Sequence, residues 1–444
     1  MDDALSIFAA ERDAGTRIGL VADGRGRTYA ELASLTRDRI RVLAPALAPD
    51  GPHIVIADNS LATMITVYAL LELGVPPLLL HPRLTDTERS DQVRAVGAVA
   101  VVLPAGAAAV LHTSGTTGTP RAAVLTRGAL LASAAASAAN LGWQEGDRWL
   151  LCMSIARIGG LSIVTRCLAA RSCVVLADGF DATSFPRRLD DDAITLASLV
   201  PTMLHQVLDA HPAWMAPPRL RAILVGGAVA PPALLDRAQQ RGLPIVLTYG
   251  MTETCSQVVA TPYAERYAPA GCGTGRALPG AEIRIRDGQI EVRGPMLMAG
   301  FLGQAPLAPG AWYPSGDLGA LDARGCLTVD ARRTDLVVTG GENVYPAEVE
   351  GVLEQCPGIA AAGVFGIPDP LWGQVVVAAL VAGEGPPDDG MLASHIAVRL
   401  APHKRPRRIV YVASLPHTAA GKPDRAALAA LAGEPRAVRY PRDE

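Results

Sequence analysis

The sequence predicts an α/β protein with a large N-terminal domain of layered βαβ units, a small β-barrel-like part, and a smaller α+β C-terminal domain. Short apolar runs bounded by turn residues alternate with helical stretches rich in alanine and leucine, which is typical of parallel strands buried on both faces. The 444 residues also exceed the ~250–300 at which single hydrophobic cores stop growing. We therefore expect two or more domains.

The first strands are expected at apolar runs along the N-terminal part of the chain: "PHIVIAD" (52–58), "SCVVLAD" (172–178), "RAILVGG" (221–227) and "LPIVLTYG" (243–250). Between the last two runs, "PALLDRAQQRG" has the composition of a helix. Strands separated by helices in this way indicate βαβ units and parallel sheets.

The pattern changes near residue 280. "AEIRIRDGQIEVRG" (281–294) alternates apolar and polar residues around Asp287-Gly288, which predicts an antiparallel hairpin. A second hairpin is expected in "LGALDARGCLTVDARR" (318–333), and a smaller α+β unit follows. We place the domain boundary between residues 332 and 333, giving an N-terminal domain 1–332 and a C-terminal domain 333–444.

Composition excludes several classes of protein. The formal net charge is -3 and no basic block is longer than "HKRPRR", so no nucleic-acid partner is expected. The longest apolar run, "VYALLELGVPPLLL", contains Glu72 and two prolines, which argues against a membrane span. The seven cysteines form no C-x-x-C pair, so we expect neither a zinc site nor a disulfide framework. With an acidic N-terminus that lacks a signal-peptide pattern, a cytoplasmic protein is expected.

The most informative segment is "VLHTSGTTGTPRAAVLT" (110–126). We expect a strand to enter it and a helical segment to leave it. Its hydroxyls, with backbone N–H groups opened by Gly115 and Gly118, form a suitable cradle for phosphate oxygens. A Walker-type loop is excluded because Thr119, Pro120 and Arg121 follow Gly118. A polar turn without a ligand remains the alternative for this segment alone.

This segment resembles the phosphate loop of the adenylate-forming superfamily, which contains acyl-CoA synthetases, luciferases and adenylation domains. The usual motif ends in Pro-Lys-Gly, whereas this chain has Arg121 and Ala122. Further segments resemble the family's motifs in the family's order: "VGGAV" (225–229), "TYGMTE" (248–253), "WYPSGD" (312–317), "RRTDLVVTGGENVYPAEVE" (332–350) and "GK" (421–422). Together these six matches are far more specific than any one of them.

The resemblance implies an ATP site, a Mg²⁺ ligand and catalytic residues. Glu253 would be the metal ligand, since a carboxylate is a hard oxygen ligand, and Thr252, Glu253 and Lys422 would be catalytic. Asp317 and Arg332 would approach the ribose and Tyr249 the adenine. The remaining ATP-binding residues implied are Thr113, Ser114, Gly115, Thr116, Thr117, Gly118, Gly226, Gly227, Ala228, Gly250 and Met251. Taken singly, each of these would be ordinary surface, turn or core.

The C-terminal part would be mobile and would serve two half-reactions. Lys422 is one of only two lysines among 40 Lys+Arg, and a late-arriving ammonium would stabilise charge as pyrophosphate leaves. The hinge aligns with Thr334, where the family usually has Asp or Lys. The pantetheine arm of coenzyme A would pass a loop made by Gly340, Gly341, Glu342 and Asn343, whose alternative reading is a simple turn.

For the acid, "YGMTETCSQV", "SLVPTMLHQVL" and "GGENVYPAEVE" resemble o-succinylbenzoate–CoA ligases of menaquinone synthesis. Arg157 replaces their usual histidine, and with Gly160 it is expected at the acyl pocket. Alternatively, Arg157 points outward or pairs with a neighbouring acid. The hypotheses are a coenzyme A ligase using ATP and Mg²⁺, an adenylating enzyme for another aryl or acyl acid, with coenzyme A or a carrier-protein pantetheine as acceptor, and a nucleotide-binding module without ligase activity. A homodimer also remains open.

Overall fold

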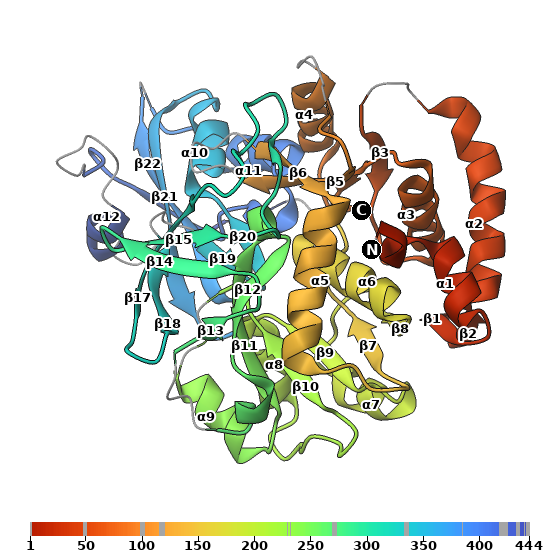
Figure 1. Cartoon of the computed structure of the whole chain (residues 1–444). Helices are drawn as coiled ribbons and strands as arrows, with labels where there is room; N and C mark the ends of the chain where they lie inside the picture. Colours follow the sequence, from red (N-terminus) through yellow and green to blue (C-terminus); the bar gives the residue numbers. More distant parts are fainter. Residues whose placement is uncertain are drawn as a thin grey trace. The chain divides into compact units, whose positions relative to one another are not determined.

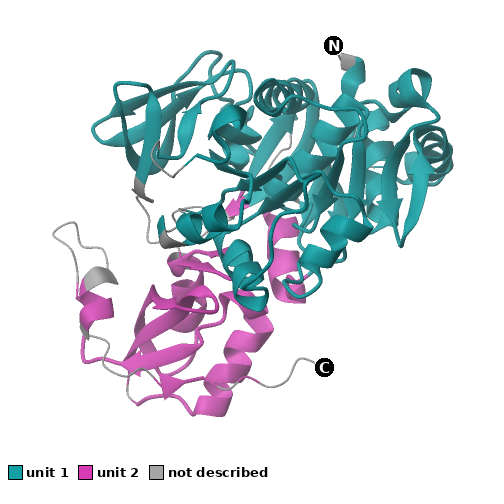
Figure 2. Ribbon diagram, turned by 90° about the horizontal axis from the view of Figure 1, so that it is seen from below, with its two compact units in different colours: residues 1–82, 96–112, 122–331 teal, residues 83–95, 113–121, 332–444 magenta. Residues whose placement is uncertain are grey.

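The computed structural model is shown in Figure 1. The structure describes residues 2–47, 51–97, 103–114, 120–228, 230, 232–268, 273–332, 337–383, 385–416, 425–431, 436–438 and 440. The chain folds into two compact units, coloured teal and magenta in Figure 2. The first unit comprises residues 1–82, 96–112 and 122–331, and the second comprises residues 83–95, 113–121 and 332–444. The domain boundary expected between 332 and 333 stays a prediction.

A 13-stranded sheet forms the framework of the first unit, in the order β14-β15-β17-β18-β13-β12-β11-β10-β9-β7-β8-β1-β2. Its strands are β1 Ile18–Ala22, β2 Arg25–Thr28, β7 Arg148–Leu151, β8 Cys173–Leu176, β9 Leu196–Leu199, β10 Ala222–Val225, β11 Ile245–Met251, β12 Ser256–Ala260, β13 Gly275–Ala277, β14 Glu282–Arg286, β15 Gln289–Arg293, β17 Tyr313–Leu321 and β18 Cys326–Arg332. The pairs from β1 through β8, β7, β9 and β10 to β11 are parallel. The predicted α/β class is confirmed.

The antiparallel part of this sheet begins at β12 and includes both predicted hairpins. Strands β14 and β15 pair antiparallel, with Ile285 opposite Ile290. Asp287 and Gly288 join them at φ +50° and +75°, the left-handed conformation that a two-residue turn of this kind requires. Strands β17 and β18 are also neighbours in the sheet, as expected.

A five-stranded sheet, in the order β16-β6-β5-β4-β3, lies mainly in the first unit. Its strands are β3 His53–Ile56, β4 Pro77–Leu80, β5 Ala107–Ser114, β6 Pro120–Thr126 and β16 Gly300–Phe301. The expected helical segment after the phosphate loop is wrong, because β6 occupies residues 120–126. The alanines in this stretch favour a helix only weakly, and pairing with β16 outweighs that preference. The helix begins only after Thr126, whose hydroxyl accepts a hydrogen bond from the Ala129 N–H at 3.1 Å.

Helices cover the strands on both faces. They are α1 Ile7–Ala14, α2 Tyr29–Leu43, α3 Leu61–Leu73, α4 Asp86–Gly97, α5 Arg127–Leu141, α6 Ile158–Ala170, α7 Phe185–Asp191, α8 Pro201–Ala210 and α9 Pro232–Gln240. One core joins side chains of both sheets with those of α3, α5 and α6, for example Leu130 and Leu161. A second core packs Phe185, Leu204 and Leu234 of α7, α8 and α9 against the other face of the large sheet.

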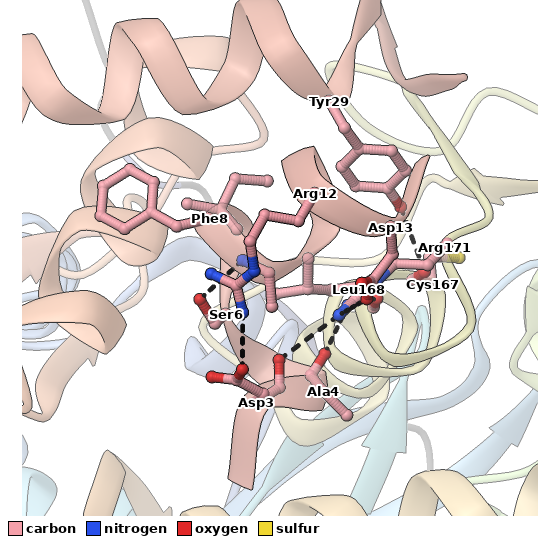
Figure 3. A network of polar contacts seen from close by, with 12 residues as sticks. Asp3, Ala4, Ser6, Phe8, Arg12, Asp13, Tyr29, Cys167, Leu168 and Arg171 are labelled. Carbon is pink, nitrogen blue, oxygen red and sulfur yellow. Dashed lines mark hydrogen bonds and ion pairs between the residues drawn. The ribbon is translucent and has the colours of Figure 1, made fainter. Parts of the chain in front are cut away.

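The C-terminal end of α6 is tied to the N-terminal segment (Figure 3). Arg171 follows the helix in a left-handed conformation, with φ +53°. Its guanidinium donates hydrogen bonds to the carbonyl of Ala4 at 2.7 Å and to the carboxylate of Asp13 at 2.9 Å. The buried Tyr29 hydroxyl donates to the carbonyl of Ser172 at 2.7 Å, and burial raises the pKa of Tyr29 well above its ordinary value. These contacts stabilise α6, whose other end follows the candidate acid pocket.

The second unit has its own sheet and core. Its strands are β19 Val337–Thr339, β20 Glu342–Val344, β21 Ile359–Asp369, β22 Gly373–Ala382, β23 Arg408–Tyr411 and β24 Arg436–Ala437. The order is β20-β19-β22-β23-β24, and β21 pairs with β22. Its helices are α10 Pro346–Glu354, α11 Asp389–Arg399 and α12 Arg425–Leu431. One of its apolar cores contains Val349 and Leu353 of α10 and Ile396 of α11, so this is the α+β arrangement expected.

Among the described cysteines, one is bonded and the others are free. Cys326 is disulfide-bonded, whereas Cys152, Cys167, Cys173, Cys255 and Cys356 are free and buried. One bonded cysteine is not a disulfide framework, and the expectation that the chain has no such framework stays a prediction. Within the described residues, no helix is long and apolar enough to cross a membrane.

Candidate active site

The segment predicted to contact ATP forms a tight hairpin between β11 and β12. A single 3₁₀ turn, η3 (Thr252–Thr254), connects the strands. The Thr254 hydroxyl accepts a hydrogen bond from the Met251 N–H at 2.9 Å and donates to the carbonyl of Ser256 at 2.6 Å. The carbonyl of Glu253 accepts from the Met298 N–H at 2.8 Å. The backbone that carries Thr252 and Glu253 is therefore fixed on both sides.

This hairpin contains backbone strain. Cys255 and Ser256 have φ values of +49° and +96°, a region that costs residues other than glycine ~1–3 kcal/mol each. The buried Ser133 hydroxyl on α5 donates to the carbonyl of Cys255 at 2.7 Å. One turn later on α5, the Ser137 hydroxyl accepts from the side-chain amide of Gln257 at 3.0 Å. These contacts stabilise a conformation that the local sequence does not favour.

Two predicted site glycines are required by close packing. A Cβ on Gly250 would lie 2.0 Å from the carbonyl oxygen of Ser256, on the paired strand. A Cβ on Gly226 would lie 2.2 Å from the Thr248 hydroxyl. Glycine is therefore needed at both positions whether or not a nucleotide binds. Their neighbours Gly227 and Ala228 are described, and Gly227 has φ +82°.

The structure joins two predicted nucleotide-binding residues directly. The Tyr249 hydroxyl donates a hydrogen bond to Asp317 Oδ2 at 2.9 Å, and both side chains are buried. The Asp317 N–H donates to Ser315 Oγ at 3.0 Å, and Ser315 in turn donates to the carbonyl of Ile290 at 2.7 Å. Tyr249 thus orients the carboxylate, and Ser315 holds the Asp317 backbone, as suits a group that recognises neighbouring hydroxyls.

The candidate acid-binding residues lie where the connection after β7 enters α6. Arg157 is the residue before the helix and has extended backbone, with φ -115° and ψ 151°. A Cβ on Gly160 would lie 2.3 Å from the carbonyl oxygen of Ser154, so the turn between them can pack only around a glycine. The position after a parallel strand is where ligands collect in α/β sheets.

Asn59, which the sequence analysis missed, fixes this connection. Its buried side-chain amide donates to the carbonyls of Met153 at 3.1 Å and Ala177 at 3.2 Å. Its oxygen accepts from the Ile155 N–H at 3.3 Å. The available signal was a polar residue directly after the apolar run "PHIVIAD". For Ser133 the signal was a second serine four residues later, on the same helix face.

β5 leads into the phosphate loop and β6 leads out of it, and residues 113–121 between them belong to the second unit. The Thr113 hydroxyl donates to the carbonyl of Arg121 at 3.4 Å across the two strands. Ser114 ends β5 and Arg332 ends β18, and the side chains of both lie outside the described part of the chain. Other predicted site residues lie outside it altogether: Gly115, Thr116, Thr117, Gly118, Thr334 and Lys422.

The predicted coenzyme A loop is the two-residue turn between β19 and β20. Gly340 and Gly341 have φ values of +57° and +83°, and Thr339 pairs with Glu342. The Gly340 N–H donates to the carbonyl of Trp372 at 2.9 Å, and a Cβ on Gly340 would lie 2.9 Å from the Trp372 ring. The expected helix starts at Pro346. Asn343 lies in β20, within the segment that connects the turn to this helix.

The fit of a magnesium ion rests on Glu253. Among the described residues, no group of three or more His, Cys, Asp or Glu side chains could hold a metal ion. Mg²⁺ bound with nucleotide phosphates needs only one or two protein carboxylates, because phosphates and waters supply the other ligands. A single carboxylate on the rigid β11–β12 hairpin fits that requirement.

Comparison with known proteins places the chain in a family. The family profile "AMP-binding enzyme" matches residues 103–302, and "AMP-binding enzyme C-terminal domain" matches residues 348–422. A 2-succinylbenzoate–CoA ligase of Listeria monocytogenes serotype 4b is 34% identical, over 91% of this chain and 94% of the relative. The corresponding Bacillus licheniformis ligase is 36% identical, over 82% of this chain and 86% of the relative.

Solved structures agree with these matches. A double mutant of o-succinylbenzoate CoA synthetase from Bacillus subtilis, bound to a product analogue, has a TM-score of 0.89 at 31% identity, covering 98% of this chain and 99% of that chain. An amide bond synthetase from Marinactinospora thermotolerans has a TM-score of 0.83 at 26% identity, covering 95% of this chain and 99% of that one. The chain belongs to the family of adenylate-forming, AMP-binding enzymes.

Proposed function

We propose that this protein is an ATP-dependent acid–coenzyme A ligase that activates 2-succinylbenzoate through an acyl-adenylate. The observation that carries the proposal is the near full-length similarity to 2-succinylbenzoate–CoA ligases, 34% over 91% of this chain. The Tyr249–Asp317 pair and the β11–β12 hairpin support it, since both lie at the positions of the family's nucleotide motifs.

In the first half-reaction, a carboxylate oxygen attacks the α-phosphorus of ATP, and the bond to pyrophosphate breaks. Thr252 lies beside Glu253 on η3 and would face the α-phosphate. Mg²⁺, when bound at Glu253, would neutralise phosphate charge. Asp317 would accept hydrogen bonds from the ribose, with its carboxylate oriented by Tyr249. Lys422 would stabilise the charge that develops as pyrophosphate leaves.

In the second half-reaction, the sulfur of coenzyme A attacks the acyl carbon and AMP leaves with the oxygen that joined them. The thiol proton is released to solvent, so the products are the thioester, AMP and a proton. The β19–β20 hairpin, which has no Cβ at Gly340 and Gly341, would let the pantetheine arm pass close to the backbone. Thr334 would be the hinge between the two states.

Arg157 would select the acid. 2-Succinylbenzoate has two carboxylates, and only one of them is activated. A guanidinium at the start of α6 would pair with the other carboxylate. The role of Arg157 is therefore specificity, and it is separable from the adenylation chemistry.

The proposal extends to acceptor, location and assembly. Free coenzyme A is the expected acceptor, as in the named relatives, and a carrier-protein pantetheine is the alternative. A cytoplasmic location is expected because ATP and coenzyme A are cytoplasmic substrates. Whether the chain forms a homodimer is tested by light scattering of the purified protein.

The test is a pyrophosphate-release screen with aryl, dicarboxylic and fatty acids, with and without coenzyme A. We expect 2-succinylbenzoate to give the fastest release, and a thioester only when coenzyme A is present. Fast release with a different acid would reassign the substrate. Release without any thioester from free coenzyme A would favour a carrier-protein acceptor, and no release with any acid would favour a nucleotide-binding module.

A further inference from the structure

The second lysine of the chain, Lys404, lies in a buried charge cluster of the second unit. Its ammonium is 2.8 Å from Glu88 Oε1 and 2.7 Å from Glu348 Oε1. The side chains of Lys404, Glu88 and Glu348 are only 6%, 7% and 14% exposed. Glu88 and Lys404 are 316 residues apart in sequence. A contact of this separation and burial is specified by the fold and is not a chance surface pair.

The geometry explains why a chain that uses arginine almost everywhere has a lysine here. Only two of its 40 Lys+Arg residues are lysine. An ammonium is a compact point charge whose three N–H donors diverge, so it can approach two carboxylates from different elements. A planar guanidinium is larger and points its donors in one plane. Lys404 therefore satisfies a requirement for a small cation between Glu88 and Glu348.

Glu88 and Lys404 are both charged at neutral pH. Burial alone would raise the pKa of Glu88, but Lys404 and hydrogen bonds from Thr85 and Ala401 outweigh it and lower the pKa. Burial alone would lower the pKa of Lys404, but Glu348 and Glu88 outweigh it and raise the pKa. Two carboxylates and one ammonium leave one negative charge in excess. Removing the ammonium would therefore leave two buried carboxylates uncompensated.

Each carboxylate belongs to the start of a helix. Glu88 Oε2 also accepts from the Thr85 N–H at 2.8 Å, which closes a capping box at the start of α4. Glu348 lies in the first turn of α10, directly after the segment that carries the predicted coenzyme A loop. Lys404 ends the 3₁₀ turn η5 (Pro402–Lys404), which packs against β20. The ammonium thus links three elements around the β19–β20 hairpin.

A second ion pair connects the same two stretches of chain. Arg83 lies 3.8 Å from Glu342, a residue of the predicted coenzyme A loop. Arg83 and Glu88 both belong to the segment 83–95, and Glu342 and Glu348 both lie beyond residue 332. Ionic contacts at both ends of this short stretch restrain the hairpin.

We propose that Lys404 is a positioning residue for the thiol-transfer half-reaction, and that it acts by fixing the β19–β20 hairpin between Glu88 and Glu348. This inference rests on the proposed ligase function. Glu88, Glu348 and Lys404 all lie in the second unit, so the ion pairs restrain the hairpin within that unit. The two lysines of the chain then serve one half-reaction each, Lys422 for adenylation and Lys404 for thiol transfer.

The decisive variant is Glu88→Gln. Glutamine preserves the capping box at Thr85, and the remaining Lys404–Glu348 pair is electrically neutral, so the fold should persist. We expect thioester formation from supplied acyl-adenylate to slow by about tenfold, and adenylate formation to change by less than about twofold. Lys404→Arg should also slow thiol transfer, because a planar guanidinium cannot contact both carboxylates.

Glu291→Gln is the matched control. Glu291 is also buried and pairs with Arg284 at 2.5 Å, but it lies on β15 of the first unit. We expect both of its half-reactions to stay within about twofold of the wild type. A selective loss of thiol transfer in this variant would show that the effect of Glu88→Gln is not specific to the cluster.

Hydrogen exchange provides a readout that does not depend on activity. In Glu88→Gln, amides of residues 337–346 should exchange faster than in the wild type, with the β11–β12 hairpin unchanged. Equal loss of both half-reactions, or unchanged exchange in residues 337–346, would overturn the inference. Failure of the proposed function is a different outcome, because there the wild type forms no thioester from 2-succinylbenzoate.

Discussion

The two hairpins that serve the proposed half-reactions are stabilised by different forces. The β11–β12 hairpin of the first unit is fixed by short, neutral hydrogen bonds, including those from Thr254 and Ser133. The β19–β20 hairpin of the second unit is flanked by ion pairs, from Arg83 to Glu342 and from Lys404 to Glu88 and Glu348. Neutral contacts suit a surface that is the same in both half-reactions. Ion pairs, unlike neutral hydrogen bonds, weaken when a carboxylate is protonated.

The largest expected effect is that of Lys422→Ala, which distinguishes the role of Lys422 from that of Lys404. Lys422→Ala should reduce adenylate formation by about 10²–10³-fold, the usual cost of losing one charge-stabilising donor in a transition state. Thioester formation from supplied acyl-adenylate should remain largely intact, the reverse of Glu88→Gln. The measurement is rapid-quench kinetics of each half-reaction, with Lys422→Arg as the matched variant that should recover only part of the rate. If a folded Lys422→Ala variant lost both half-reactions equally, the proposal that each lysine serves one half-reaction would be wrong.

The next largest effect concerns the acid and leaves both hairpins untouched. Arg157→Ala should raise KM for 2-succinylbenzoate by about 30-fold, since it would remove one partner of the proposed, partly desolvated charge pair. A monocarboxylic aryl analogue should be affected much less. The same small change for both substrates would indicate that Arg157 does not contact the second carboxylate.

A smaller effect should follow from loosening the neutral hairpin. Ser133→Ala removes a buried hydrogen bond to the strained Cys255, at a cost of ~1 kcal/mol, or about fivefold in rate. Because the proposed mechanism has the β11–β12 hairpin contact the nucleotide in both half-reactions, we expect both rates to fall together. Thr36→Val is the control, since its buried hydroxyl donates only within α2, to the carbonyl of Leu32. A loss confined to one half-reaction would contradict the proposed difference between the hairpins.

The smallest expected effect is the loss of the Glu88–Lys404 ion pair on acidification. The pKa of Glu88 is lowered from its ordinary 4.5, so its contribution to stability is present above that pH and is lost as pH falls through the lower folded value. The pKa of Lys404 is raised from 10.5, so its contribution is present below 10.5 and is lost only at higher pH. Hydrogen exchange below pH 4.5 should therefore increase in the β19–β20 hairpin before it does in the β11–β12 hairpin. Simultaneous loss of protection would argue that ionic contacts do not distinguish them.

The sequence predicted features that local chemistry determines. The Asp287-Gly288 pair specifies its own turn, and the glycines and hydroxyls of the nucleotide motifs follow family spacing. The helix expected after the phosphate loop was wrong because residues 120–126 form a strand that pairs with β16. In such cases strand pairing determines whether a segment is a helix or a strand, and the pairing involves residues far away in sequence.

Contacts between distant residues could not be predicted. Asn59 contacts carbonyls about a hundred residues later, and the three members of the Lys404 cluster come from separate elements. Nothing in a window around Lys404 distinguishes it from a solvated residue of the basic run "HKRPRR". The only signal was that lysine is rare in this arginine-rich chain, and this signal does not identify the residues that Lys404 contacts.

The most direct test follows one oxygen atom. 2-Succinylbenzoate labelled with ¹⁸O in its carboxylates is incubated with the protein, ATP, Mg²⁺ and coenzyme A, and the nucleotide product is analysed by mass spectrometry. If a carboxylate oxygen attacks the α-phosphorus and the thiol then displaces AMP, one ¹⁸O must appear in AMP, in equal amount with the thioester. Formation of ADP, or unlabelled AMP, would contradict an acyl-adenylate intermediate and with it the assignment of the two hairpins to successive half-reactions.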